Sequence, residues 1–250
     1  MSEETISERG ALTAVQLVRR ITGLGSPEKA RLLMRFFKTG PGQYGEGDMF
    51  AGLTVPEIRS MAREYRGLPL RETVELLRSP VHEARLLALI LLIQEYRNGD
   101  SALKSRIYGI YLENTMHINN WDLVDASAEH IIGAHVFGKS RELLYRLAVS
   151  DLLWERRIAI IATFFFIKSG SFEDTLRIAE MLLPDREDLI HKAVGWMLRE
   201  VGKRDRAAEE AFLSRHYRNM PRTMLRYAIE KFPEQLRQKY LKGLIRPKRN

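Results

Sequence analysis

The chain has 250 residues, of which 45% are hydrophobic and 29% are charged, so it is long enough for one sizeable domain or a continuous array of repeats. Its 40 Lys and Arg residues against 32 Asp and Glu residues give a formal net charge of +8, which favours acidic partners such as nucleic acid. The sequence contains no cysteine, which excludes thiol catalysis, disulfides, iron–sulfur clusters and cysteine-ligated zinc.

Helical periodicity dominates the chain, and convincing strand alternation is nearly absent. The predicted helices, in chain order, cover residues 12–23, 27–38, 55–65, 70–78, 81–98, 101–116, 121–136, 139–148, 151–168, 172–183, 186–203, 206–218, 221–231 and 233–242. One long irregular loop lies between them, at residues 39–52 (TGPGQYGEGDMFAG). This loop lacks the GxxxxGK pattern, so we interpret it as a linker or a groove edge and not as a nucleotide cradle.

Short helices joined by short turns, paired about every 30–40 residues, favour an all-α superhelix, a HEAT-like repeat solenoid with a concave basic groove. The alternative is an irregular globular helical bundle. We expect a single domain over residues 1–250, with frayed tails at 1–10 and 243–250.

The sequence also predicts where the protein resides. Its N-terminal sequence, MSEETISERG, is polar and acidic, unlike a secretory signal. The longest apolar runs, 86–93 and 158–167, are too short to span a bilayer. We therefore expect a soluble monomer of the cytoplasm, in the bacterial cytosol or associated with the nucleoid, that does not contact a membrane.

A stripe on the predicted helix 186–203 combines cations with an indole. At about 3.6 residues per turn, one narrow face carries Lys192, Trp196, Arg199 and Lys203. Apolar residues occupy the opposite face, so the stripe suits a polyanion with flat surfaces, such as nucleic acid. The alternative is an ordinary solvated face whose tryptophan is covered by a neighbouring helix. Gly195, within this helix, indicates that something approaches its backbone closely.

A second candidate segment is INNWDLVDASAEHII, in which Asn120 is a good helix N-cap. Asp125 follows Trp121 by one turn and is a carboxylate on an otherwise apolar and aromatic face, which is costly unless it is paired or functional. Arg157 borders the apolar face of LWERRIAIIATFFF, and it either reaches a phosphate or pairs with Asp125. A structural ion pair between repeats and a functional carboxylate both stay open from these residues.

Other kinds of site find little support in the sequence. The histidines never form an HxxxH pair, so we expect no metal site and no cofactor. The sequence also lacks a GxSxG nucleophile pattern.

Three segments together, NNWDLVD, LWERRIAI and HKAVGWMLREVGKRD, resemble the signature regions of the DNA alkylation repair protein family, the AlkD-like HEAT-repeat DNA glycosylases. The resemblance extends roughly from Leu32 to Leu241. It implies a curved solenoid that grips duplex DNA. It further implies excision of purines alkylated at N3 or N7, such as 3-methyladenine and 7-methylguanine, without a deep pocket for a flipped base.

By matching motif, the resemblance assigns the catalytic residues. Trp121 and Trp196 resemble the two tryptophans at the lesion, Asp125 the carboxylate, and Arg157 the arginine of the third wall. Where the family carries a tyrosine on an early helix, the nearest match here is Phe36.

The resulting interpretation is a base-excision-repair DNA N-glycosylase, a hydrolase whose carboxylate stabilises an oxocarbenium-like deoxyribose. The predicted DNA-binding residues are Arg157, Lys192, Arg199 and Lys203, which would hold phosphates. Two alternatives stay open. One is a non-catalytic helical-repeat module that recognises distorted nucleic acid. The other is a protein-interaction scaffold whose basic stripe meets an acidic partner.

Overall fold

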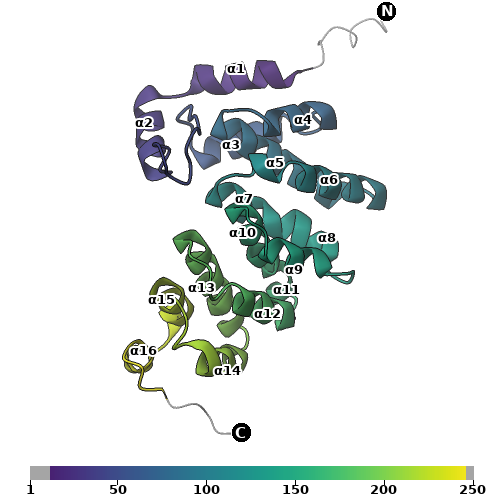
Figure 1. The fold of residues 1–250 in the computed structure, drawn as a ribbon. Coiled ribbons are helices and arrows are strands. Elements are labelled where there is room, and N and C mark those ends of the chain that lie inside the picture. The colour runs from purple at the N-terminus through teal and green to yellow at the C-terminus, as the bar shows by residue number, and fades with distance from the viewer. Residues whose placement is uncertain (1–11, 246–250) are drawn as a thin grey trace, which may run out of the picture. The chain divides into compact units, whose positions relative to one another are not determined.

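The computed structural model describes residues 12–245, and within this range the chain is helical without a β-strand. An isolated parallel bridge joins Met49 to Val81. The chain divides into two compact units, Met1–Leu123 and Val124–Asn250, and the division falls inside α7 (Trp121–Ala128) (Figure 1). The predicted all-α helical-repeat class is therefore confirmed, whereas the prediction of one domain over the whole chain stays a prediction.

The first unit is built around one buried helix. Its elements are α1 (Ala14–Leu24), α2 (Pro27–Phe36), α3 (Val55–Glu64), α4 (Leu70–Leu77), α5 (His82–Asn98), α6 (Ser101–Glu113) and the 3-10 turn η1 (Thr115–His117). Helix α5 is apolar on nearly all sides, and α1, α3, α4 and α6 pack against it (Figure 1). Helix α2 differs, because Ala30 is its one buried residue, while Leu32 and Phe36 are 58% and 64% exposed.

The second unit consists of helices packed in two layers. After α7, its elements are η2 (Glu129–Gly133), α8 (Ala134–Val136), α9 (Glu142–Ala148), α10 (Leu153–Ala162), α11 (Phe164–Lys168), α12 (Glu173–Met181), α13 (Asp188–Gly202), α14 (Arg206–His216), α15 (Arg222–Ala228), η3 (Ile229–Lys231) and α16 (Glu234–Leu241). Helix α13 packs against α10 and α15, and α9, α12 and α14 pack against this layer (Figure 1). Stacked helix pairs of this kind are the unit of helical-repeat proteins.

Two predicted helices are interrupted in the structure. The predicted helix 121–136 contains a π-helical turn, η2, where a Cβ on Gly133 would clash with the carbonyl oxygen of Ala162. The predicted helix 151–168 breaks at buried Thr163, whose hydroxyl donates to the Ile160 carbonyl at 2.7 Å. Hydrophobic periodicity reports neither of these contacts.

The ends of the described chain bear on two further expectations. The predicted tails at 1–10 and, beyond residue 245, at the C-terminus lie outside the described residues. Before that point, the Tyr217 hydroxyl donates to the carbonyls of Gly243 and Ile245, at 3.1 and 2.8 Å. Among residues 12–245, no helix combines the length and the apolar character that a membrane crossing needs.

One buried acid in the second unit makes stability depend on pH. Glu209 of α14 is 2% exposed and lies against Gly202 of α13. Its Oε1 accepts no hydrogen bond from any described residue. Burial raises the pKa of Glu209 to about 8, Glu210 adds to the rise, and Arg206 opposes it. The folded protein therefore keeps this carboxyl protonated at neutral pH.

We predict that Glu209→Gln stabilises the protein at alkaline pH. Because the pKa rises from 4.5 in the unfolded chain to about 8, the folded state loses about 1.4 kcal/mol per pH unit between these values and nothing further above them. The gain in free energy of unfolding should grow from about pH 5 to pH 8 and then stay constant. Denaturant titrations measure it, with exposed Glu113→Gln as the control. A gain independent of pH would contradict the assignment.

Candidate nucleic-acid interface

In the second unit, Asp125 of α7 forms an ion pair with Arg157 of α10. Arg157 Nε donates to Asp125 Oδ1 at 2.9 Å, and Nη2 donates to Oδ2 at 2.8 Å, which is a bidentate pair. The remaining nitrogen, Nη1, donates to the carbonyl of Leu189 at the start of α13. The side chain of Arg157 is 5% exposed, and that of Asp125 is 18% exposed. The carboxylate is therefore held in one orientation and keeps an accessible edge.

This geometry bears on the two alternatives for Arg157. The structure shows the guanidinium paired with the carboxylate and bound to a third helix. A contact between Arg157 and a phosphate stays a prediction. Neighbouring Arg156 pairs with Asp185 instead, with Nε 2.6 Å from Oδ2, as expected for a side chain that points about 100° away around the helix.

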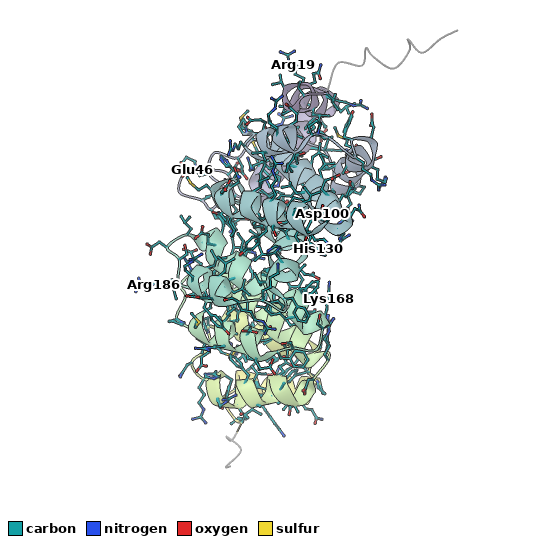
Figure 2. The ribbon with its side chains drawn as sticks, turned by 90° about the vertical axis from the view of Figure 1, so that its right-hand side faces the viewer. Arg19, Glu46, Asp100, His130, Lys168 and Arg186 are labelled. Atoms are coloured by element: carbon teal, nitrogen blue, oxygen red, sulfur yellow. The ribbon has the colours of Figure 1, made fainter. Side chains whose placement is uncertain are left out.

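Trp196 of α13 has two neighbours in the second unit. Its indole Nε1 donates to Glu200 Oε1 at 3.2 Å. Its ring lies against Phe164 of α11, with centroids 5.8 Å apart and planes tilted by 59°. Lys168, labelled in Figure 2, places its ammonium 4.2 Å from the centroid of Phe164. Trp196 is thus half-buried and partly covered by a neighbouring helix, as one of the two alternatives predicts.

Glu200 is one of the residues that sequence reasoning missed. It is 6% exposed, and its Oε1 lies 2.6 Å from Lys203 Nζ. Arg204 and Arg199 approach the same carboxylate at 3.5 and 3.8 Å. Burial pushes the pKa of Glu200 upward, but Lys203, the Trp196 N–H and Arg199 together outweigh burial, so the pKa is lowered. Its position four residues after Trp196 and three before Lys203 is the signal that could have revealed this role.

The cations of the predicted stripe all have acidic partners within the second unit. Lys192 Nζ lies 2.7 Å from Asp188 Oδ2, and Arg199 pairs with Glu230 as well as with Glu200. The stripe is therefore a set of ion pairs in which Lys192 and Lys203 keep 40% and 43% exposure.

The close approach predicted at Gly195 occurs between helices. A Cβ at this position would lie 2.5 Å from both the carbonyl oxygen of Met224 and the Cβ of Tyr227 in α15. The glycine thus lets α13 and α15 pack closely, and the approaching group belongs to the protein itself.

Trp121, in the first unit, ends a stack of aromatic rings. It stacks on Phe37 at 5.2 Å, Phe37 stacks on Phe50 at 5.0 Å, and Phe50 stacks on the imidazole of His82 at 4.4 Å. Phe36, the nearest match to the family's tyrosine, meets Trp121 edge-on at 6.0 Å. The stack packs against one face of the Trp121 indole and thereby orients it.

The loop at residues 39–52 anchors the start of α7 through Asp48. His82 places Nδ1 3.1 Å from Asp48 Oδ2 and Nε2 2.8 Å from Asp122 Oδ2. Arg85 and Asn120 donate to Asp48 at 2.6 and 3.1 Å. Burial lowers the pKa of His82, but its hydrogen bonds to the two carboxylates outweigh burial, so the pKa is raised.

Sequence reasoning missed Asp48 and His82 because their contacts span 34 to 72 residues and leave no local pattern. Figure 2 shows Glu46 of the same loop at the surface of the first unit. No cluster of three or more His, Cys, Asp or Glu side chains able to hold a metal ion occurs among residues 12–245.

Comparison with known proteins agrees with the family resemblance that the three sequence segments carry. The model of the family described as DNA alkylation repair enzyme matches residues 17–232. The chain belongs to this DNA alkylation repair family. Its role is therefore in the repair of alkylated DNA, which implies that it binds DNA.

A solved structure, the predicted DNA alkylation repair enzyme from Enterococcus faecalis, has the same fold. It is 18% identical, with a TM-score of 0.65, over 84% of this chain and 97% of that chain. No curated protein matches the chain.

We predict that Glu200 controls both the indole and the cations around it. Glu200→Ala removes the acceptor of the Trp196 N–H, so the indole ¹H–¹⁵N resonance of Trp196 should shift, whereas Glu200→Gln keeps an oxygen there and should shift it less. Both variants free cations, so affinity for unmodified duplex should rise about three- to tenfold at low salt. An unshifted resonance in Glu200→Ala would contradict the positioning role.

Proposed function

We propose that this repair protein is a DNA N-glycosylase that excises cationic N3- or N7-alkylated purines, such as 3-methyladenine and 7-methylguanine, from duplex DNA. The pair between Asp125 and Arg157 is the observation that carries the proposal. A surface that only binds the DNA backbone has little use for a carboxylate, because a carboxylate repels phosphates. Here a buried arginine holds one with its edge accessible.

Cleavage of the glycosidic bond of an alkylated purine needs little help from a general acid. Alkylation places a positive charge on the purine, so the base leaves with the electrons of the C1′–N bond and becomes neutral. The deoxyribose then develops oxocarbenium character, which the carboxylate of Asp125 would stabilise. A water adds to C1′ and releases a proton. The products are the free base and an abasic site.

The indoles and cations would position the DNA. Trp196 and Trp121, which precedes Asp125 by one turn of α7, are the proposed aromatic contacts to the cationic sugar or base. Lys192 and Lys203 are exposed enough to exchange a carboxylate for a phosphate, and Arg199 would follow them. The bidentate geometry favours Arg157 as the residue that positions Asp125.

Asp125→Asn is expected to abolish release of 7-methylguanine while affinity for duplex DNA stays the same or rises, because a negative charge is lost. The measurement is free base released from methylated duplex DNA, alongside binding to the same duplex. Because Arg157 would lose its counter-charge, thermal melting must show that the variant is folded.

Normal excision by Asp125→Asn would remove the catalytic assignment. Affinity without base release in the wild-type protein would favour the non-catalytic binding module. No duplex affinity at physiological salt would favour the protein scaffold.

The salt dependence of binding separates phosphate contacts from internal ion pairs. Lys192→Ala and Lys203→Ala should each reduce the slope of log K against log salt by about 0.9. Arg157→Ala should reduce excision and leave the slope nearly unchanged, since its guanidinium is occupied. Lys239→Ala, outside the stripe on α16, is the control. A reduced slope in Arg157→Ala would instead establish the predicted phosphate contact.

A further inference from the structure

The first unit contains a cavity of about 550 Å³, and of its lining residues the proposed chemistry uses only Trp121. It lies between α2, residues 50–55, the start of α5 and the start of α7. Its volume falls within the range of about 300–1,000 Å³ of small-molecule sites. Four aromatic side chains contribute to its walls, namely Phe36, Phe37, Phe50 and Trp121.

The walls are largely aromatic, and three of their rings stack on one another, with Trp121 at the end of the row. Phe37 and Phe50 are nearly parallel, with 20° between their planes, and Trp121 is nearly parallel to Phe37, with 17° between theirs. Aromatic side chains of this kind stack on nucleobases whatever the base, because every base has a π-face. Phe36 and Leu32 line the same cavity and are more than half exposed, so a ligand would cover apolar surface that now faces solvent.

One buried oxygen at the cavity has unused hydrogen-bonding capacity. Asp122 lines it, and its Oδ2 is bound to His82, whereas Oδ1 is buried and accepts no hydrogen bond from any described residue. Glu83, which also lines the cavity, has both oxygens engaged by the amides of residues 51–53. Asp122 Oδ1 is thus a hydrogen-bond acceptor that no described residue occupies.

We propose that this cavity binds a free amino-purine, the class of base that excision releases. The ring would stack on Trp121, which ends the row of stacked rings, with Phe36 beside it, and the exocyclic amine would donate to Asp122 Oδ1. An aliphatic ligand would leave that oxygen unpaired, which disfavours it. The proposal relies on the proposed function only for the source of the base.

Equilibrium binding of free bases to the full chain tests the proposal without DNA. The probes are 3-methyladenine, adenine and unsubstituted purine, which lacks the amine, and the readouts are calorimetry and saturation-transfer NMR. Adenine and 3-methyladenine should bind saturably and about tenfold more tightly than purine. Phe36→Ala, at an exposed position, should weaken adenine binding about tenfold.

Leu24→Ala, exposed on α1 and outside the cavity, is the matched control and should bind adenine as the wild type does. Absence of saturable binding at millimolar base, equal binding of purine and adenine, or equal weakening by Leu24→Ala would overturn the proposal. A protein that excises bases without binding them free would overturn the cavity assignment alone. One that binds amino-purines without excision would support it while refuting the proposed function.

Discussion

Arg157 connects three helices of the second unit through one guanidinium. Two of its nitrogens meet the carboxylate of Asp125 on α7, and the third meets the backbone at the start of α13. A buried arginine needs a counter-charge, because an unpaired buried charge costs several kcal/mol, roughly 3–5 when a partner is removed. This requirement keeps Asp125 in place, and the same guanidinium contacts the beginning of the helix that carries Trp196.

Buried carboxylates organise much of this basic protein. Asp48 secures the start of α7, Glu83 binds the amides of residues 51–53, and Glu200 holds an indole together with neighbouring cations. Each of the three sits among enough donors to satisfy a charge. Glu209 is the contrasting case, since its Oε1 accepts no hydrogen bond from a described residue and burial keeps its proton in place.

The aromatic residues form two groups with different surroundings. In the first unit, Trp121 ends a stack of rings that leads inward to His82 and borders a cavity. In the second unit, Trp196 meets a phenylalanine and a carboxylate. The first group therefore offers a flat apolar surface, and the second an indole in a charged setting.

Local sequence determined the helices, their apolar faces and the family motifs, because periodicity and turn residues act over a few positions. It also singled out Asp125 with Arg157 as possible partners, since a carboxylate on an apolar face demands one. Only the tertiary structure decided that this pair forms and that Asp48 binds His82 and Asn120. Those contacts depend on which donors surround each carboxylate once distant segments meet. Burial and neighbouring charge arise from the packed fold, and no spacing along the chain encodes them.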